Sequence, residues 1–427
     1  MTTQAKAKWL RFLVLVLGGG TIYKLANLKD AFYVPMQENM GLSHTEIGTL
    51  LSVNAIVATV LFVAGGFLAD RYEPRRLIPV GLIGAGLLGL YMATFPGFGA
   101  MLIVFGLLAI CADCLFFPSL LKAIRNLGDD DEQGRMFGFL EGGRGVVDTL
   151  IAFAALGVFL VMGSGADGLK SAILFYSAIN IGAGLLTWFL LSDAEPRADG
   201  GKEPVGLAGL MEAARVPGIW LVSLNVFMVY IVYCGLTYFI PYLKDMYELP
   251  VALVGAYGII NQYFLKVLGG PAGGYMSDKT FRSPSRYLKW AFLALLPVMG
   301  VIVALPTGPG FIYPAMAATL SFAFIVFTMR GVFWAPMSEV GIPSRITGSA
   351  FGIGCLIGYA PGMFAYMIYG AILDRFPGEQ GYTYVFGLMS ALAVIGFVVA
   401  SLLRRTISGG AALAGASEAA TEATSGA

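Results

Sequence analysis

Charged residues are scarce in this chain of 427 residues. Asp, Glu, Lys and Arg together make up 12% of it, well below the roughly 25% of soluble domains. Hydrophobic residues make up 57%, and the mean hydropathy is +0.77. These values exclude a water-soluble globular domain and indicate an integral membrane protein. The net charge of +1 gives no sign of a nucleic-acid partner, and none is expected.

Histidine and cysteine are also rare. The one histidine, His44, stands in Ser43-His44-Thr45-Glu46, a pattern typical of a helix N-cap, so we expect a structural role for it. Cys111 and Cys114 have no second cysteine pair to complete a metal site. The sequence contains no P-loop and no nucleophile elbow, which disfavours an ATP-driven pump and a hydrolase. We therefore expect no metal, no cofactor and no enzymatic activity.

Long apolar runs dominate the chain. A helix needs about 20 apolar residues to cross a hydrocarbon core about 30 Å thick, and the alternation of a β-barrel strand is absent. The sequence therefore predicts an all-α integral membrane protein with twelve transmembrane helices. These helices are expected at 9–35, 44–69, 76–95, 98–122, 137–162, 170–192, 217–242, 251–276, 287–305, 310–335, 348–373 and 382–403.

The chain repeats itself. Gly66-Phe67-Leu68-Ala69-Asp70-Arg71 and Gly274-Tyr275-Met276-Ser277-Asp278-Lys279 share a Gly-x-x-small-Asp-base pattern, and each follows an apolar run. Upstream residues keep the same register, namely Pro35/Pro241, Met40/Met246, Leu42/Leu249, Gly48/Gly255 and Asn54/Asn261. Such repetition is typical of a transporter whose two halves enclose a site at the membrane midplane.

The repeat and the polar segments divide the chain into four parts. An N-terminal six-helix half is expected over 1–192 and a C-terminal six-helix half over 218–405, with two-fold pseudo-symmetry between them. The Pro- and Gly-rich segment 193–217 is predicted to be a linker with a short surface helix. Residues 406–427 are rich in Gly, Ala, Ser, Thr and Glu, and we expect a disordered tail.

The loop cations predict the orientation. Apart from Lys170, Lys244 and Arg375, the lysines and arginines outside the spans fall on one side of the predicted topology. By the positive-inside rule, both termini and the linker are expected to be cytoplasmic.

These features together resemble the major facilitator superfamily. Twelve spans, two halves, a long central loop and the repeated Gly-x-x-x-Asp-Arg loop carry the resemblance, which covers about residues 9–405. The segments Arg330–Glu339, Gly348–Ile353 and Ile357–Pro361 also resemble a bacterial branch grouped with sugar-acid and nitrate permeases, which implies a multi-pass protein of the bacterial inner membrane. Glu73 and Pro74 depart from the usual loop pattern.

The resemblance implies that the repeated loop is a cytoplasmic gate. Carried over to this sequence, the gating residues are Gly66, Asp70, Arg71 and Asp278. Glycine would let helices approach closely and Asp70 would face a helix end or an arginine. The alternative is a turn that serves only to fix the topology.

Five cations lie inside predicted spans, away from their ends, and need an explanation: Lys24, Lys29, Arg144, Lys266 and Arg330. Each costs about 2.5 to 3.5 kcal/mol at a helix centre unless it meets an anion or water. The acids in the same spans are Asp30, Asp113, Glu141 and Asp148. The spans thus hold one more cation than acids, which favours an anionic ligand.

Three of these charges share one helix face. At about 100° per residue, Glu141, Arg144 and Asp148 lie in a narrow stripe that should face a central cavity. Arg144 can bind a planar anion through two hydrogen bonds, and the carboxylates Glu141 and Asp148 are candidates for proton coupling. Asp113 is a further candidate, expected to pair with Lys24 or Arg144. The alternative is a salt-bridge ladder that only holds helices together.

The other candidates divide between substrate binding and gating. Lys24, near the middle of the first predicted helix, is the stronger substrate candidate. For the two tyrosines of the substrate set, Tyr230 and Tyr233, the alternative is ordinary packing. The substrate set is completed by Tyr230, Tyr233, Gln262, Lys266 and Arg330. Arg330 and Glu339 are also candidates for an inner gate, and Lys29 with Asp30 for an outer gate or a snorkelling pair.

The leading interpretation is a secondary active transporter of a small organic anion such as a carboxylate, sugar acid or sulfonate. Proton symport by alternating access is the expected mechanism, carried out by a monomer surrounded by membrane lipid. The alternative is a proton-driven exporter of drugs or metabolites, disfavoured because the fifth span lacks the Gly-x-x-x-Gly-Pro motif of such exporters. A nitrate or nitrite exchanger is disfavoured because the second span has no arginine.

Overall fold

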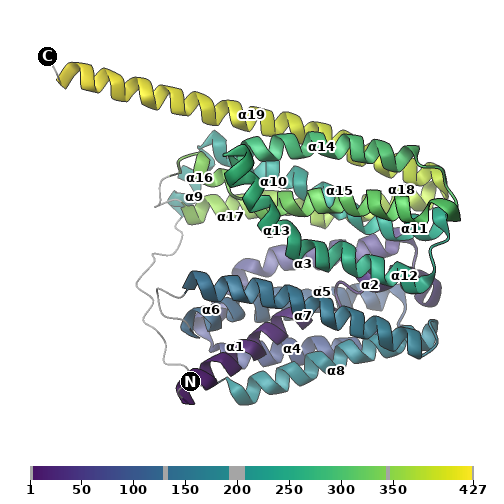
Figure 1. Ribbon diagram of the computed structural model, residues 1–427. Coiled ribbons are helices and arrows are strands. Elements are labelled where there is room, and N and C mark those ends of the chain that lie inside the picture. The colour runs from purple at the N-terminus through teal and green to yellow at the C-terminus, as the bar shows by residue number, and fades with distance from the viewer. Residues whose placement is uncertain (1–2, 128–132, 192–206, 343–346, 426–427) are drawn as a thin grey trace.

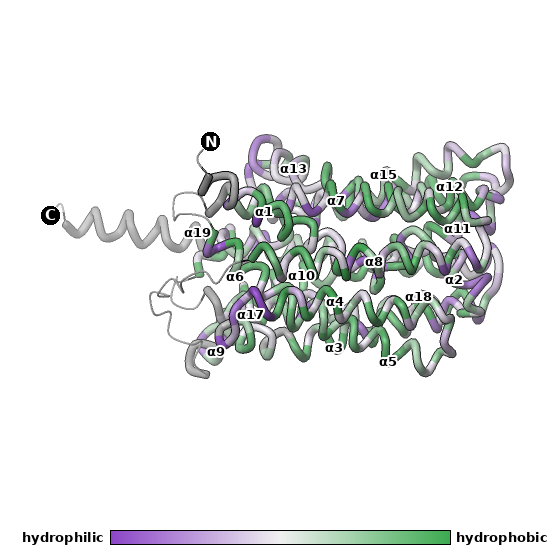
Figure 2. The backbone as a smooth tube through the Cα atoms, turned by 90° about the horizontal axis from the view of Figure 1, so that it is seen from below, coloured by the Kyte–Doolittle hydropathy of each residue, from purple (hydrophilic) through white to green (hydrophobic). Residues whose placement is uncertain are grey.

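The structure is a computed structural model that describes residues 3–127, 133–191, 207–342 and 347–425. Within these ranges every regular element is helical. Eleven of the helices there are long and apolar enough to cross a membrane. Figure 1 shows them running side by side as a bundle, and Figure 2 shows hydrophilic residues gathered at its two ends. The predicted all-α membrane fold is confirmed.

The first group of helices comes from the first half of the chain. Its elements are α1 (Thr3–Thr21), α2 (Lys29–Met40), α3 (His44–Arg71), α4 (Pro74–Met92), α5 (Phe98–Ala109), η1 (Ile110–Phe116), α6 (Phe117–Leu127), α7 (Gln133–Val161) and α8 (Ala166–Leu190). Elements α5, η1 and α6 form one continuous span in which η1 is a π-helical turn. The predicted surface helix of the linker is confirmed as α9 (Leu207–Ala214); residues 192–206 lie outside the described ranges.

The second group comes from the second half of the chain. Its elements are α10 (Pro217–Gly235), η3 (Leu236–Tyr238), α11 (Phe239–Tyr247), α12 (Val251–Ile259), η4 (Ile260–Phe264), α13 (Leu265–Tyr275), η5 (Met276–Phe281), α14 (Pro284–Ala304), η6 (Pro309–Phe311), α15 (Ile312–Val332), α16 (Pro336–Glu339), α17 (Thr347–Gly358), η8 (Ala360–Met363), α18 (Ala365–Arg375) and α19 (Glu379–Ser425). The turn η8 breaks the eleventh predicted span between α17 and α18.

The first predicted span is the one that departs from expectation. Its helix ends at Thr21, residues 22–28 form turns, and a second helix starts at Lys29. Backbone bonds in the break include four-residue turns, such as the one closed by Lys24 N donating to Thr21 O at 3.0 Å. Such irregular backbone is tolerated at membrane depth only where protein covers it, and here Leu25 is fully buried. Lys24 therefore lies in a helix break, and not in the middle of a helix.

The duplicated sequence has a duplicated backbone. The seventh span is also interrupted, by η3 between α10 and α11. Helix α2 ends at Gly41 with φ 66°, and α11 ends at the repeat-related Glu248 with φ 57°. Helices commonly end at a residue in the left-handed conformation, and this residue is usually glycine. Glu248 adopts the conformation although its side chain disfavours it, so the turn is kept in both repeats.

The two groups of helices pack most closely at one end of the bundle. The basic end is defined here as the end that holds Arg71, Lys279, Arg286 and Arg404; the two groups meet at the opposite end (Figure 1). There α3 packs on α18 and α2 on α12. A Cβ at Gly258 would lie 1.9 Å from the Asp30 carbonyl oxygen. Glycine at this position is therefore required by the contact between the groups.

A carboxylate reinforces this contact. Asp374, in α18, accepts hydrogen bonds from His44 N at 3.1 Å and Thr45 N at 2.7 Å, at the start of α3. The predicted capping box at Ser43 and Glu46 is confirmed on the same helix end. His44 Nδ1 lies 2.7 Å from the hydroxyl of Tyr33. A negative charge at a helix N-terminus is stabilising, so Asp374 ties α18 to α3.

Two glycines, Gly65 and Gly273, pack closely against neighbouring helices, and each stands one residue before the repeated motif. A Cβ at Gly65 would lie 2.7 Å from Cys114 O, and one at Gly273 would lie 2.1 Å from Thr328 O. At Gly66 and Gly274, a Cβ would meet nothing within 4 Å. The expectation that the motif glycine itself permits close packing is therefore wrong for this structure, because helix rotation points the next position away from the neighbour.

The last helix also differs from expectation. Helix α19 continues through Ser425, past the boundary at residue 406 where we predicted a disordered tail. The segment is rich in alanine, which has the highest helix propensity, so composition without an apolar period does not prevent a helix here. Figure 1 shows this part of α19 extending beyond the rest of the bundle.

Neighbouring glycines provide a matched test of the α13–α15 contact. Gly273→Ala should lower the stability by about 1 to 3 kcal/mol, because the new methyl group overpacks against the Thr328 backbone. Gly274→Ala should leave the thermal unfolding temperature unchanged or slightly higher. Thermal unfolding of the purified protein in detergent measures both. Equal effects of the two substitutions would contradict this account of the contact.

Candidate functional site

A buried ion pair joins the first-span break to α7. Lys24 Nζ lies 2.8 Å from Asp148 Oδ1, with the lysine 1% and the aspartate 14% exposed. The ammonium also lies 3.4 Å from the ring centre of Tyr263, in η4, close enough for a strong cation–π contact. It donates no hydrogen bond of good geometry to a described residue. The charge of Lys24 is thus neutralised by Asp148, and its ammonium is fully buried.

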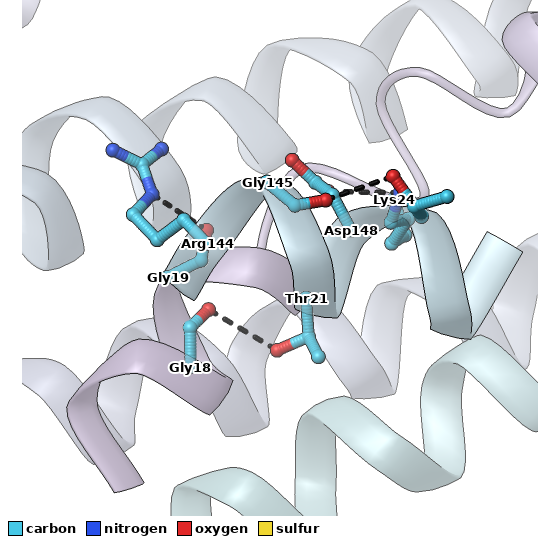
Figure 3. A network of polar contacts seen from close by, with 8 residues as sticks. Gly18, Gly19, Thr21, Lys24, Arg144, Gly145 and Asp148 are labelled. Carbon is cyan, nitrogen blue, oxygen red and sulfur yellow. Dashed lines mark hydrogen bonds and ion pairs between the residues drawn. The ribbon is translucent and has the colours of Figure 1, made fainter. Parts of the chain in front are cut away.

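Glycines bring the broken span and α7 together. A Cβ at Gly20 would lie 2.6 Å from Val147 Cγ1, and one at Gly19 would lie 2.9 Å from Arg144 Cδ. The backbone can therefore approach α7 closely enough for direct polar contacts. Figure 3 shows Arg144 and Asp148 both reaching from α7 to the first span, at Gly19 and Lys24 respectively.

Arg144 is neutralised by a carboxylate of its own helix, that of Glu141. Its Nη1 donates to Glu141 Oε1 at 2.8 Å, and its Nε donates to Gly19 O at 3.1 Å. Glu141 is 58% exposed, whereas Arg144 is 12% exposed. The predicted stripe therefore consists of two separate pairs, because Asp148 is engaged by Lys24.

Asp113 has a different partner from the one expected. It lies in the π-helical turn η1 and accepts a hydrogen bond from the Tyr23 hydroxyl at 2.9 Å. Neither Lys24 nor Arg144 forms an ion pair with it. The expectation of such a pair is wrong because Asp148 and Glu141 occupy those cations first. Among the described residues, Asp113 is thus an embedded carboxylate without a cationic partner.

Lys29 and Asp30 form a buried ion pair with each other. Lys29 Nζ also lies 5.5 Å from the ring centre of Tyr366 in α18. Because Asp30 O contacts Gly258 of α12, the pair lies where the two groups of helices meet. This place fits the predicted outer gate, and the gating role stays a prediction.

Arg330 is the embedded arginine without an acidic partner in the described part of the chain. Its guanidinium carbon lies 3.8 Å from the ring centre of Tyr233, 5.6 Å from that of Tyr230 and 5.9 Å from that of Phe327. Tyr359 packs edge-on against Tyr230, with centroids 5.0 Å apart. The two predicted tyrosines therefore belong to an aromatic cluster that covers the faces of Arg330, while the N–H groups at its edge remain free for a ligand.

Lys266 and Gln262 complete the predicted substrate residues. Lys266 has an exposed side chain, forms no ion pair with a described residue, and interacts electrostatically with Asp148, Glu141, Arg144 and Arg330. Gln262 is 4% exposed and lies in the π-helical turn η4 beside Tyr263. The structure thus places Lys266 among the charges of both groups of helices.

The inner gating candidates separate. Glu339 accepts from Ser283 Oγ at 2.6 Å and from Ser285 N at 3.0 Å, so it caps α14 within its own group of helices. Arg71 and Asp278 are exposed at the basic end. The Asp70 side chain lies outside the described residues. The structure therefore supplies no contact between these motif residues, and their gating role stays a prediction.

Sequence reasoning missed three tyrosines of the site. Tyr23 binds Asp113, Tyr263 covers Lys24, and Tyr359 packs against Tyr230 of the Arg330 cluster. Tyr23 adjoins Lys24 and Tyr263 adjoins Gln262 in sequence, which was an available signal. Their partners come from other helices, so the pairings themselves required the fold.

Comparison with known proteins identifies the family. The model of the Major Facilitator Superfamily matches residues 30–365. The chain belongs to the Major Facilitator Superfamily. It is therefore a membrane transporter and not an enzyme, as the repeated loop and the helix count predicted.

The relatives cover nearly the whole chain. The inner membrane protein YihN of Escherichia coli strain K12 is 47% identical, over 94% of this chain and 97% of its own length. A probable nitrate/nitrite transporter, NarK2 of Mycobacterium tuberculosis, is 27% identical over 89% and 92%. A hexuronate transporter of Bacillus subtilis is 21% identical over 85% and 88%.

A solved structure has the same fold. The bacterial homologue of the human lysosomal transporter Spinster, inward-facing and unoccupied, matches with a TM-score of 0.76 and 16% identity. The match covers 95% of this chain and 98% of the homologue. At this identity the likeness establishes the fold alone.

The Lys24–Asp148 pair predicts an asymmetric response to mutation. Asp148→Asn should cost about 3 to 5 kcal/mol, because it leaves an almost fully buried ammonium without a counter-charge. Lys24→Gln should cost less, since Asp148 retains some contact with solvent. The double variant Lys24→Gln/Asp148→Asn should recover most of the loss. Thermal unfolding of the four proteins in detergent measures the coupling.

Glu141→Gln provides the matched control. It removes the partner of Arg144, but at an exposed carboxylate, so its effect should stay within about 1 kcal/mol. Additive effects of the two substitutions at 24 and 148 would show that the pair does not stabilise the fold.

Proposed function

We propose that this transporter carries a small organic anion, namely a carboxylate, sugar acid or sulfonate, by proton symport through alternating access. The observation that carries the proposal is Arg330, an embedded guanidinium stacked on Tyr233 without an acidic partner in the described residues. Arginine binds carboxylate and similar planar groups through two parallel hydrogen bonds. Arg330 is thus the proposed anchor for the anionic group.

The balance of embedded charges supports an anion. Lys24, Lys29 and Arg144 are neutralised by Asp148, Asp30 and Glu141. Arg330 and Lys266 carry no such partner in the described residues. An anion between them would supply the missing negative charge, and the Lys24 donors are proposed to reach its polar groups.

The names of relatives agree with this chemistry. Nitrate and nitrite, named for the NarK2 relative, and a hexuronate, named for the Bacillus relative, are all oxyanions. An organic anion is favoured because the tyrosines around Arg330 and the amide of Gln262 suit a ligand with hydroxyl groups. The relatives named inner membrane proteins support the same location for this chain.

Proton coupling is assigned to Asp113. Protonating Asp148 or Asp30 would leave a buried lysine unpaired, which is costly inside a membrane, whereas Glu141 is exposed. Protonating Asp113 leaves no cation unpaired, because its partner is the Tyr23 hydroxyl. Asp113 is therefore the embedded carboxylate that can gain and lose a proton at the lowest electrostatic cost.

A ligand panel tests the proposed anchor. The purified protein should be stabilised by D-glucuronate or 2-hydroxyethanesulfonate and not by D-glucose, as measured by thermal shift. Arg330→Gln should weaken anion binding by about 30-fold or more, since one partner of a buried charge pair is lost. Arg330→Lys should also bind weakly, because an ammonium lacks the planar fork.

The matched control is Arg375→Gln. Arg375 also stacks on an aromatic ring, with its guanidinium carbon 5.7 Å from the centre of Phe376, but it lies near the opposite end of the bundle. Its loss should leave anion affinity unchanged. Unchanged affinity in Arg330→Gln for every stabilising anion would remove Arg330 from the site, and stabilisation by nitrate alone would refute the organic substrate.

Transport in proteoliposomes tests the proton role. Asp113→Asn should abolish accumulation driven by a pH gradient, because the amide cannot be protonated, while exchange of labelled for unlabelled substrate continues. Tyr23→Phe should retain both activities with altered pH dependence. Accumulation by Asp113→Asn at the rate of the unmodified protein would contradict the assignment.

A further inference from the structure

A basic cleft lies between α14 and α19, away from the central charges. Its cations are Lys289, Arg404 and Arg405, and its volume is about 540 Å³. The two helices pack side by side near the basic end of the bundle (Figure 1). The cleft brings the three cations together. None of them forms an ion pair with a described residue. The transport mechanism uses none of them.

The wall of the cleft is apolar and continues along the membrane-facing surface. Phe397, Val398 and Leu402 line it. Val398 and Leu402 are 48% and 46% exposed, and Trp290 beside the cleft is 46% exposed. Exposed apolar residues on a transmembrane helix face the hydrocarbon of lipid. An exposed tryptophan near a helix end is typical of the interface between hydrocarbon and water.

Lys289 is held toward this interface by aromatic rings. Its Nζ lies 5.2 Å from the ring centre of Phe397 and 5.8 Å from that of Trp290. Ser401 and Ser408 also line the cleft, and the Ser401 hydroxyl donates to Phe397 O at 2.7 Å. The cleft therefore combines three positive charges at one end with an apolar surface at the other.

We propose that this cleft binds an anionic phospholipid, with its phosphodiester among Lys289, Arg404 and Arg405 and its acyl chains along the apolar surface of α14 and α19. Basic pockets between transmembrane helices bind such head groups through charge. A second copy of the chain is disfavoured as the occupant, because a two-fold contact here would bring the same cations together. A free phosphate would leave the adjoining apolar surface unused.

Lipid titration of the purified full-length protein, read by native mass spectrometry, tests the proposal. Dioleoyl phosphatidylglycerol should form a saturable adduct, and zwitterionic dioleoyl phosphatidylcholine should bind at least about tenfold more weakly. The variant Lys289→Gln/Arg404→Gln/Arg405→Gln should lose at least about tenfold in affinity for phosphatidylglycerol. Inorganic phosphate in millimolar excess should not displace the lipid.

Three other cations at the same end provide a matched control. Lys279→Gln/Arg282→Gln/Arg286→Gln removes the same charge from exposed positions of the same group of helices. It should retain phosphatidylglycerol binding. Equal losses in the two triple variants would overturn the proposal in favour of net charge, and displacement by inorganic phosphate would overturn it in favour of a simple anion site.

A single substitution keeps the test available if the triple variant does not fold. Arg405→Glu changes an exposed residue, so it should leave the folded state intact. It should still weaken phosphatidylglycerol binding severalfold, because it reverses one of the three charges. Unchanged binding by a folded Arg405→Glu variant would contradict the proposal. The site is separate from Arg330, so this result is independent of the substrate.

Discussion

The structure depends on how embedded charges are neutralised. An ammonium or guanidinium inside a membrane needs a counter-charge, an aromatic face or water. Asp148 supplies the counter-charge to Lys24, which lies in the break of the first span, where the backbone approaches α7. The glycines at positions 19 and 20 permit that approach. The helix break, the close glycine contact and the Lys24–Asp148 pair thus occur together at the candidate site.

The charges are arranged differently in the two groups of helices. In the first group, lysine and arginine are matched by acids on α2 and α7. In the second group, Arg330 is covered by aromatic rings, and Lys266 is exposed. A ligand between the groups would therefore meet paired charges on one wall and unpaired cations on the other. Only the unpaired cations gain a new counter-charge when an anion binds, and this favours Arg330 over Lys24 as its anchor.

Backbone contacts hold the groups together at the end opposite the basic loops. Gly258 lies against the Asp30 carbonyl, and Asp374 caps α3 from α18. Both contacts depend on short-range geometry, since one uses a missing Cβ and the other uses two hydrogen bonds. Alternating access requires such contacts to break while others form at the basic end. A Cβ at Gly66 or Gly274 would meet nothing within 4 Å, which leaves room there for a second arrangement.

Composition and the repeated loop by themselves determined the membrane class, the helical fold, eleven of the spans and the family, because apolar length and motif spacing are local properties of the chain. The embedded cations were also visible in the sequence, since charge is unexpected in an apolar run. Only the tertiary structure decided that Lys24 lies in a break, that Asp113 bonds to Tyr23 and that Arg330 has no acidic partner in the described residues. Those outcomes depend on which helix supplies the nearest opposite charge, and side chains far apart in sequence compete for each partner.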